Sequence, residues 1–459
     1  MKTNFKDILE TNKKEYLNRL IDLLKINSIL DESTKTASMP FGKGINDCLN
    51  HFVSMAKNDG FSVEVDPGYA AHVEYGSDGK LIGILCHLDV VPVGDDWDHD
   101  PFDPVVKDGK VIARGAMDDK GPTMAAYLAL KMIKDAKIPL KNKIRIILGT
   151  DEETGWRGID HYFTKYPMPE IGFAPDADFP LIYGEKGIIH GFINGNYVDE
   201  NDDLVYVKGG ERFNIVLGKT KAATRTSHEE AFDAFLKENN LEGTFKEEDG
   251  LYCYEVLGIA AHAMEPEKGI NSGTYLCKFL SNYTNNSLVH FIKDKLHLDH
   301  NMKNLNLYHE HEEMGMITCN MGILDSSNNT SKCSLDIRYP IGLDFDNFTS
   351  ILKAETEPYS LSLSDFSNKV PHYVDPKDPL VEGLYNIYVK HTNDFINKPK
   401  TIGGGTYSRA LKKAVAFGME MPGDETVAHQ KNEYLKLDAF YQAILIYLDA
   451  ILFLGDLDA

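Results

Sequence analysis

The stretch GILCHLDVVPVG, residues 83–94, begins as a buried strand and ends in polar side chains. It completes the apolar run LIGILC at 81–86, after which His87 and Asp89 follow before the chain turns at a proline and a glycine. Side chains two residues apart on a strand lie on the same face, so this imidazole and this carboxylate leave the same edge of the apolar run. The stretch therefore predicts a buried strand with a polar site at its carboxyl end.

Further apolar runs alternate with helical segments along the first part of the chain. KIRIILG at 143–149 and IGFA at 171–174 are typical of buried strands, and a Gly-Pro pair at 121–122 begins the helical pattern TMAAYLALKMIKDA. A long final helix is expected over 435–454. Strands that alternate with helices predict an α/β fold with a mixed, largely parallel sheet and flanking helices.

The length of 459 residues exceeds what one hydrophobic core usually organises, so two domains are expected. From residue 188 the pattern changes to β-rich pieces with separate helices, and the first pattern returns after residue 375. The chain is therefore predicted to consist of a discontinuous main domain, 1–187 and 376–459, and an inserted α+β lid domain, 188–375.

Charge and apolar patterning exclude several classes of protein. Lys and Arg number 48 against 70 Asp and Glu, and the formal charge of -22 opposes binding to nucleic acid or to an anionic membrane. The N-terminus has no apolar core of a signal peptide, and the apolar stretch 441–454 is interrupted by Asp449 and is too short to span a bilayer. The six cysteines form no C-x-x-C pair, which favours free thiols in a reducing compartment. We expect a soluble, cytoplasmic protein with no nucleic-acid or membrane partner.

Imidazole and carboxylate side chains follow each predicted strand of the first sheet. In open α/β sheets ligands bind outside the carboxyl ends of the strands. Side chains of this kind in one crevice would repel each other and lose hydration unless positive charge lay among them, so one or two metal ions are expected. Taken alone, each motif has an ordinary explanation, such as acidic residues at a helix N-terminus or in a solvated turn, but their common placement favours the metal. The residues concerned are His87, Asp89, Asp118, Asp119, Asp151, Glu152, Glu153, Asp176 and His429.

The motifs GILCHLDVVPVG, RGAMDDKGP, GTDEETG, FAPDADFP and ETVAHQKNE occur in this order along the chain. In order and spacing they resemble the aminoacylase/dipeptidase/desuccinylase family of two-metal peptidases, and within it most closely the PepV-type dipeptidases. The resemblance runs essentially from end to end and implies a two-metal exopeptidase fold, two divalent ions per chain and hydrolysis of a peptide bond. Sites with one histidine and carboxylates at each ion, and no thiolate, admit Zn, Co or Mn. The resemblance favours Zn, with Mn as the main alternative.

The resemblance assigns the metal ligands by position. One ion would be held by His87 and Asp176, the other by Glu153 and His429, and Asp118 would bridge the two. Asp118 is favoured over its neighbour because the family pattern is Asp, any residue, Lys, and position 120 is the lysine.

The catalytic roles follow from the resemblance in the same way. Glu152 would be the general base that takes a proton from a water shared by the ions, which lower the pKa of that water to about 7. Asp89 would accept the second ring N–H of His87 and so fix the tautomer of this ligand. His262, in GIAAHAMEPEKGIN, matches a lid-domain histidine that stabilises the oxyanion, and an ordinary turn histidine is the alternative.

Substrate selection depends on residues further out. Arg338 resembles the family's ligand for the C-terminal carboxylate of the substrate, which a planar guanidinium can bind with two hydrogen bonds. A strand residue in an ion pair is the alternative. A site that fixes this carboxylate selects short substrates, so unblocked dipeptides, including β-alanyl-His types, are the predicted substrates. The other predicted substrate contacts are Asn214, Gly403, Gly404, Gly405, Thr406 and Tyr407.

Two other functions stay open. An N-acyl amino-acid deacylase or desuccinylase of the same family would use the same metal site. The long insert instead resembles the PepV type and could complete the site within one chain, so a monomer is expected. A non-catalytic metal-binding or peptide-binding protein would be expected to have lost Glu152 or the bridging ligand, and this chain keeps both.

Overall fold

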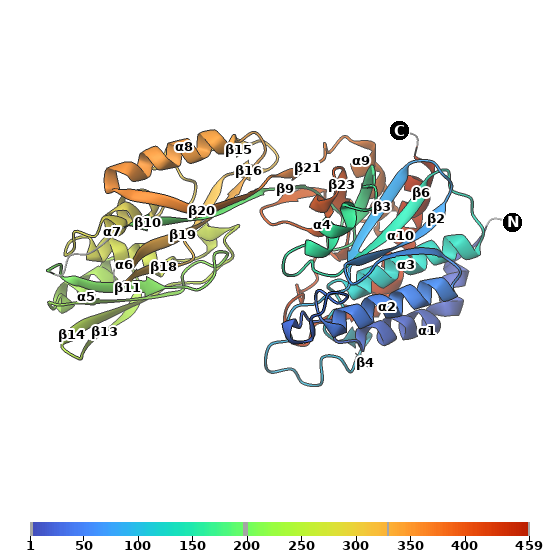
Figure 1. Ribbon diagram of the computed structural model, residues 1–459, viewed down its shortest axis with the longest axis horizontal. Helices are drawn as coiled ribbons and strands as arrows, with labels where there is room; N and C mark the ends of the chain where they lie inside the picture. Colours follow the sequence, from blue (N-terminus) through green and yellow to red (C-terminus); the bar gives the residue numbers. More distant parts are fainter. Residues whose placement is uncertain (1–2, 196–200, 328–329, 458–459) are drawn as a thin grey trace. The chain divides into compact units, whose positions relative to one another are not determined.

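The computed structural model describes residues 3–195, 201–327 and 330–457, which form two compact units (Figure 1). The first unit comprises Met1–Gly184, Tyr373–Lys400 and Thr406–Ala459, and the second comprises Glu185–His372 and Thr401–Gly405. The sequence-based division placed the insert at 188–375 and did not assign 401–405 to it. Within the second unit, Arg338 donates a hydrogen bond to the carbonyl of Gly403 in this short segment at 3.3 Å.

The first unit is built on a mixed sheet whose central strands are parallel. The pairs β6–β3, β3–β7 and β7–β23 are parallel, whereas β1, β2 and β9 run antiparallel to their neighbours. The predicted mixed α/β sheet is thereby confirmed, with its parallel pairs at the centre. In sheet order the strands are β1 (Ser62–Asp66), β2 (Ala70–Gly76), β6 (Lys143–Gly149), β3 (Leu81–His87), β7 (Ile171–Ala174), β23 (Ala414–Ala416), β9 (Ile182–Glu185) and β21 (His372–Tyr373), and β22 (Lys400–Ile402) pairs with β9.

Both faces of this sheet are covered, which explains why the central strands are mostly apolar. Alternate residues of β3 enter different clusters: Ile82 and Ile84 join the large core, and Leu85 joins a smaller cluster with Ile159. Figure 1 shows α1, α2 and α3 together along the large-core side of the strands. The helices on that side are α1 (Phe5–Leu24), α2 (Lys43–Asn58), α3 (Lys120–Asp135), α9 (Pro379–Thr392) and α10 (Leu437–Asp456), and the smaller cluster contains α4 (Arg157–Phe163).

The final helix α10 is long and apolar enough to cross a membrane by length and composition alone. Its buried side chains, Phe440, Ile444 and Ile451 among them, lie in the large core, and the helix packs against α3 and α9. Burial in this core accounts for its apolar composition. Helix α10 begins two residues after the predicted start, at Leu437.

Two further small sheets surround the carboxyl edge of the main one. One consists of β4 (Val105–Lys107), β5 (Lys110–Ile112) and β25 (Tyr434–Lys436), and the other of β8 (Ala177–Asp178) and β24 (Met419–Glu420). Strands β24 and β25 come from the late part of the chain, whereas β5 and β8 come from the early part. The two small sheets therefore connect the late segment between β24 and β25 to loops of the early part.

The second unit has the predicted α+β character. Its nine-stranded sheet is antiparallel throughout, and one face of β19 (Thr330–Tyr339) carries Leu335 and Ile337 into the core of this unit. Because side chains alternate along a strand, Asp336 and Arg338 lie on the opposite face. The other strands are β10 (Gly187–Gly195), β11 (Leu204–Gly209), β12 (Lys219–Thr224), β13 (Glu242–Glu248), β14 (Leu251–Leu257), β17 (Thr318–Asn320), β18 (Leu324–Ser327) and β20 (Leu361–Lys369), with the separate pair β15 (Glu310–His311) and β16 (Gly315–Met316). The helices are α5 (Glu229–Glu238), α6 (Ser272–Leu280), α7 (Ser287–Phe291) and α8 (Phe345–Thr356).

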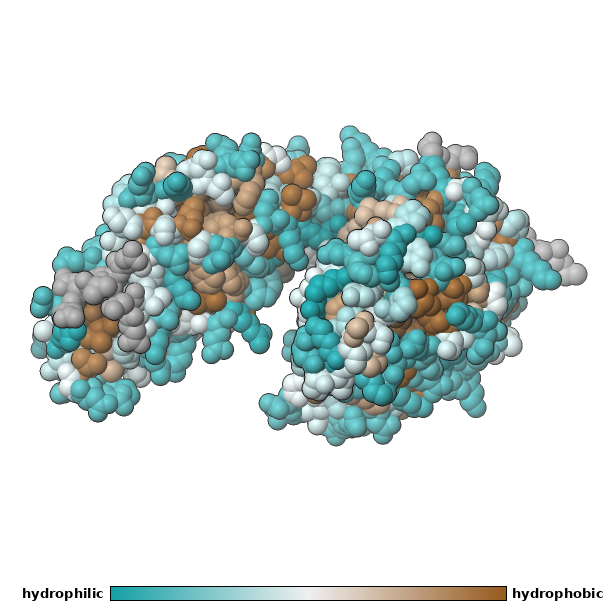
Figure 2. Space-filling model, viewed as in Figure 1, coloured by the Kyte–Doolittle hydropathy of each residue, from teal (hydrophilic) through white to brown (hydrophobic). Residues whose placement is uncertain are grey.

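The visible surface of each unit is largely hydrophilic, with apolar residues in separate groups (Figure 2). This distribution accords with a chain in which 26% of the residues are charged.

Candidate metal centre

Loops at the carboxyl edge of the first sheet bring six of the predicted residues together. Parallel strands end on the same edge of a sheet, so residues that follow different strands meet there. All six belong to the first unit. His87 ends β3, Asp118 precedes α3, Glu152 and Glu153 follow β6, Asp176 follows β7, and His429 lies between β24 and β25.

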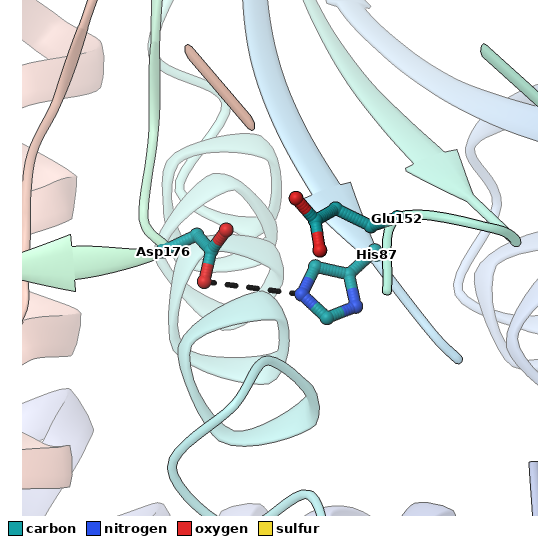
Figure 3. A group of neighbouring side chains, drawn as sticks. All are labelled: His87, Glu152 and Asp176. Carbon is teal, nitrogen blue, oxygen red and sulfur yellow. Dashed lines mark ion pairs between the residues drawn. The ribbon is translucent and has the colours of Figure 1, made fainter. Parts of the chain in front are cut away.

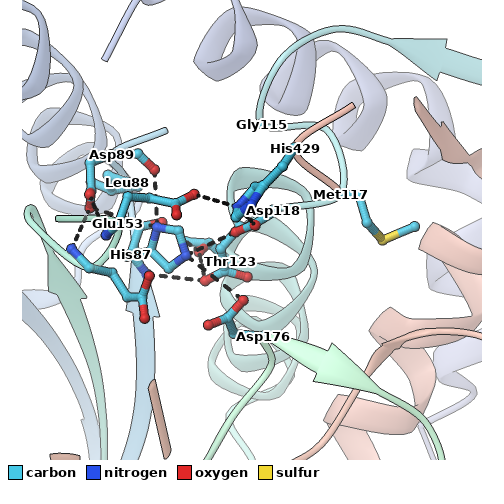
Figure 4. A network of polar contacts seen from close by, with 12 residues as sticks. His87, Leu88, Asp89, Gly115, Met117, Asp118, Thr123, Glu153, Asp176 and His429 are labelled. Atoms are coloured by element: carbon cyan, nitrogen blue, oxygen red, sulfur yellow. Dashed lines mark hydrogen bonds and ion pairs between the residues drawn. The ribbon is translucent and has the colours of Figure 1, made fainter. Parts of the chain in front are cut away.

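The carboxylate of Asp118 lies between two imidazole rings (Figure 4). Its Oδ1 is 3.0 Å from Nε2 of His87, and its Oδ2 is 2.8 Å from Nε2 of His429. Nε2 of His429 is also 3.1 Å from Oε1 of Glu153. One carboxylate thus has a different histidine at each oxygen, which is the arrangement expected of a bridging ligand.

Two sets of three side chains can each surround a cation. Ligand atoms of His87, Glu152 and Asp176 lie within 4.8 Å of one another (Figure 3), and so do those of His87, Asp118 and Glu153. Within the first set, Nε2 of His87 is 3.8 Å from Oδ1 of Asp176. The two sets share His87, so the candidate ligands form one continuous cluster.

The donor atoms and the charge of this cluster fit divalent cations. Nε2 of His87 and Oδ1 of Asp118 are buried, and no atom of the described residues completes a hydrogen bond to either of them. Burial raises the pKa of Glu152 well above its ordinary value, and burial together with Asp118 raises the pKa of Glu153 to about 7. Asp118 and Glu153 in turn raise the pKa of His429 to about 11. The buried negative charge therefore draws protons onto the cluster, and a bound cation would replace them.

The position of Asp89 differs from the prediction. Nδ1 of His87 bonds to the backbone carbonyl of Asp89 at 3.0 Å, whereas the carboxylate oxygen lies at 3.7 Å. The carboxylate instead accepts the backbone N–H groups of Glu152 and Glu153, both at 3.1 Å. The reason is that the chain turns directly after β3 and presents its own carbonyl to the ring. The bond still leaves the lone pair of Nε2 of His87 facing the cluster, and Asp89 also positions the two glutamates.

The neighbouring acidic residues have other partners, which supports the choice of Asp118 and of the two glutamates. Oδ2 of Asp119 accepts the backbone N–H of His87 and the hydroxyl of Thr123, both at 3.0 Å. Asp151 forms a two-bond pair with Arg157, at 2.8 and 2.7 Å. The Asp119 carboxylate thus holds the backbone of His87, and the Asp151 carboxylate is engaged by Arg157.

A model of peptidase family M20/M25/M40 matches residues 83–452 of this chain. The chain belongs to this peptidase family. The family predicted from the sequence motifs is thereby confirmed. Relatives named "Putative dipeptidase" include one from Staphylococcus epidermidis, 39% identical over 456 residues, which are 95% of this chain and 97% of the relative. Another, from Staphylococcus aureus strain USA300, is 38% identical over 462 residues, 97% of this chain and 98% of the relative.

Solved structures share the fold of this family member. An M20 family metallo-carboxypeptidase from Sulfolobus solfataricus has a TM-score of 0.59 at 18% identity and covers 96% of this chain and 99% of its own. Human carnosine dipeptidase 1 has a TM-score of 0.56 at 16% identity and covers 98% of both chains. At such identities the likeness shows the fold alone.

Two residues at the candidate metal centre of this family member were not predicted from the sequence. The indole N–H of Trp156 donates to Oε1 of Glu152 at 3.1 Å. Glu433 is fully buried and accepts hydrogen bonds from the segment that leads to Asp118. These contacts cannot be predicted from the sequence, because neither a tryptophan three residues after a glutamate pair nor a glutamate in a loop indicates which groups it will contact.

The predicted substrate residues Thr406 and Tyr407 belong to the first unit. The ring of Tyr407 is fully buried, and its centroid lies 5.9 Å from that of the His87 ring and 5.4 Å from that of the Trp156 ring, both in edge-to-face arrangements. A Cβ on Gly149 would lie 2.0 Å from the Tyr407 hydroxyl, so the glycine makes room for this ring. The Tyr407 ring therefore packs beneath the candidate metal centre, and the predicted contact of this residue with substrate stays a prediction.

The other predicted substrate residues form a cluster of their own on the second unit. The backbone N–H of Ala263, next to His262, donates to the carbonyl of Asn214 at 3.0 Å, and Arg338 donates to Gly403 at 3.3 Å. We call Asn214, His262, Arg338 and Gly403 to Gly405 the Arg338 cluster. Its contacts with a substrate held at the metal centre stay predictions.

Arg338 is the most constrained member of the Arg338 cluster. Its Nε and Nη2 donate to the two oxygens of Asp336 at 2.6 and 2.9 Å, and Asp336 also contacts His190 at 3.0 Å. The side of the guanidinium that carries Nε is thus already used in an ion pair, so a substrate carboxylate would have to approach the Nη1 and Nη2 end.

His262 is exposed and is set up as a hydrogen-bond donor. Its Nδ1 accepts the backbone N–H of Met264 at 3.1 Å, and partial desolvation of the ring together with the charge of Arg338 lowers its pKa. A neutral imidazole whose Nδ1 accepts a hydrogen bond carries its proton on Nε2.

Proposed function

We propose that this family member is a metal-dependent dipeptidase of the PepV type that hydrolyses the peptide bond of unblocked dipeptides. The observation that carries the proposal is the carboxylate of Asp118, with one imidazole at each oxygen and Glu152 in the adjoining set of ligands. The dipeptidase names of relatives that match nearly the whole chain support the choice of substrate.

Two divalent ions would be held by the cluster. His87 and Asp176 would hold one and Glu153 and His429 the other, with Asp118 contributing one oxygen to each. Zn is the ion we expect, with Mn or Co as alternatives, because imidazole and carboxylate donors without thiolates suit all three. Bound ions supply the polarisation of the scissile carbonyl and the lowered pKa of the attacking water.

Glu152 acts as the general base and then as the general acid. Its carboxylate takes a proton from the attacking water and delivers it to the amine that leaves when the C–N bond breaks. The Trp156 N–H at Oε1 orients the carboxylate and leaves Oε2 for the proton.

The Arg338 cluster would bind the substrate. The Nη1 and Nη2 end of Arg338, with Asn214 and the backbone of Gly403 to Gly405, would hold the C-terminal carboxylate. The Nε2 proton of His262 would stabilise the oxyanion that forms at the scissile carbonyl. A site that fixes the terminal carboxylate favours dipeptides over longer chains.

The test of this function is a panel of substrates offered to the metal-loaded protein. The panel comprises an L,L-dipeptide, β-alanyl-histidine, a tripeptide, an N-acetyl amino acid and N-succinyl-diaminopimelate. We expect cleavage of the unblocked dipeptides and little or none of the tripeptide and the acylated compounds. Cleavage of the acylated compounds alone would assign the chain to the deacylases or desuccinylases of the family. Metal binding without cleavage of any of them would favour a binding protein.

The second unit of the same chain carries the whole Arg338 cluster, so we propose that one chain suffices for activity. Light scattering of the active protein is expected to give the mass of a monomer, 51.5 kDa. A stable dimer as the sole active species would contradict this proposal.

A further inference from the structure

Four hydrogen-bond donors converge on one buried carboxylate beside the metal centre. Oε1 of Glu433 accepts the backbone N–H groups of Met117 at 2.7 Å and Asp118 at 3.1 Å. Oε2 accepts the backbone N–H of Gly115 at 3.1 Å and Nη1 of Arg114 at 2.7 Å. Figure 4 labels Gly115 and Met117 on the segment that leads to Asp118. Three of these four donors are backbone N–H groups of residues 115–118, the segment that ends at Asp118, the proposed bridging ligand.

The segment that supplies Glu433 also supplies a candidate ligand. His429 lies four residues earlier in the same loop and contacts the side chain of Asp118, whereas Glu433 contacts its backbone. The carbonyl of Glu433 accepts the N–H of Ala113 at 3.0 Å, and Asn432 bonds in both directions with Asp98 at 3.1 Å. The loop of His429 and the loop of Asp118 are therefore held together at several points, with Glu433 at the centre.

We propose that Glu433 is a positioning residue, which fixes the backbone at Asp118 so that the Asp118 carboxylate can serve both ions. This inference rests on the proposed function. Glu433 is not a member of the candidate ligand sets, and its role runs through the N–H groups from which it accepts hydrogen bonds. Without an acceptor these buried N–H groups would each be left unsatisfied, and the segment would have to move to bond elsewhere. Partners behind a ligand commonly change metal affinity by about 10- to 100-fold when they are replaced.

The test compares Glu433→Gln with a matched control, Asp59→Asn. Both substitutions neutralise a carboxylate that an arginine pairs with in the first unit, Arg114 at 2.7 Å for Glu433 and Arg19 at 2.6 Å for Asp59. Asp59 lies at the end of α2 and has no contact with the candidate ligands among its recorded partners. Zn affinity is measured by competition with a chromophoric chelator, and the melting temperature is measured on the metal-free proteins.

We expect both variants to melt at a lower temperature but only Glu433→Gln to bind Zn about 10- to 100-fold more weakly. Activity of Glu433→Gln should be lost at limiting Zn and recover in excess Zn, which a general loss of stability would not produce. If Zn affinity stays within twofold of the wild type, or falls equally in Asp59→Asn, the inference is overturned.

Glu433→Asp serves as a second variant if Glu433→Gln does not fold. It keeps the charge but shortens the side chain by one methylene, so it should also weaken Zn binding, and an unchanged affinity would overturn the inference. Failure of this inference can be distinguished experimentally from failure of the proposed function. A wild-type protein that takes up none of Zn, Mn and Co would refute the function, whereas metal uptake and dipeptide cleavage that do not respond to residue 433 would refute only the role of Glu433.

Discussion

Nε2 of His87 lies 3.0 Å from Oδ1 of Asp118, where the end of β3 meets the start of α3. Both atoms are buried and lack a completed hydrogen bond within the described residues. Such atoms are costly to bury unless a further group satisfies them, so a cation shared by this histidine and this carboxylate is the simplest way to stabilise the pair.

Replacing Asp118 should remove metal from the protein. Because its two oxygens face different histidines, Asp118→Ala is expected to lower the bound metal from two ions per chain to one or fewer and to abolish hydrolysis. Metal content is measured by mass spectrometry after gel filtration. Asp178→Ala, which changes a nearby acidic residue outside the cluster, should keep both ions; two ions retained in Asp118→Ala would contradict the bridging role.

Replacing Glu152 by glutamine should separate binding from catalysis. The amide cannot take a proton, so the rate of hydrolysis is expected to fall by about 10²- to 10⁴-fold, while metal content and melting temperature change little. Steady-state kinetics and metal analysis of the same preparation check this. A variant that keeps more than a tenth of the wild-type rate would show that another group is the base.

The Trp156 N–H is expected to matter for turnover more than for binding. Trp156→Phe keeps an aromatic ring against Tyr407 but removes the hydrogen-bond donor to Glu152. A hydrogen bond to a charged group contributes about 1.5–3 kcal/mol, so its loss should lower kcat by about 10- to 100-fold. KM should change little. Trp97→Phe is the matched control, because the chain has two tryptophans and the indole of Trp97 donates to the carbonyl of Val93 at 2.7 Å instead. Equal losses in both variants would assign the effect to general packing.

Arg338 should contribute to recognition of the substrate carboxylate. Arg338→Lys is expected to raise KM for a dipeptide by about tenfold or more, because lysine lacks the planar pair of donors. The effect should disappear for the corresponding dipeptide amide, which has no terminal carboxylate. An equal rise in KM for the dipeptide and its amide would show that Arg338 acts only through its ion pair with Asp336.

The contribution of Asp59 to stability should depend on pH. Although its burial acts in the opposite direction, hydrogen bonds from Arg19 and Tyr127 hold the pKa of Asp59 below its ordinary value of 3.8. A lowered pKa in the folded state stabilises the protein above the unfolded pKa of about 3.9, and this stabilisation is lost as the pH falls through the folded value. Asp59→Asn should therefore lower the melting temperature at pH 7, and the difference from the wild type should shrink below about pH 4. A difference that is equal at pH 7 and pH 3 would contradict the assignment.

The sequence predicted the first sheet and its polar edge because both leave strong local signals. The run LIGILC and its acidic or imidazole neighbours identify a strand and its end, and repetition of this pattern at KIRIILG and IGFA places the ends on one edge. The family motifs then separated Asp118 from Asp119, and the structure shows the physical difference: Asp119 faces the backbone of His87, and Asp118 faces both imidazoles.

Contacts that depend on the exact path of a loop could not be predicted in this way. The His87 ring bonds to the backbone carbonyl of Asp89 rather than to its carboxylate, because the chain turns directly after β3. Glu433 reaches Asp118 across more than 300 residues of sequence, and no periodicity or spacing encodes such a pairing. Similarly, the ion pair of Arg338 with Asp336 depends on both residues lying on the same face of β19.

The most direct test of the central claim is a titration of the metal-stripped protein with Zn. At each point two quantities are measured, the rate of hydrolysis of an L,L-dipeptide and the number of ions bound per chain. Two-metal catalysis predicts no hydrolysis without metal, and full activity when two ions are bound per chain. Full hydrolysis by the stripped protein, or no hydrolysis with Zn, Mn or Co at two ions per chain, would contradict it.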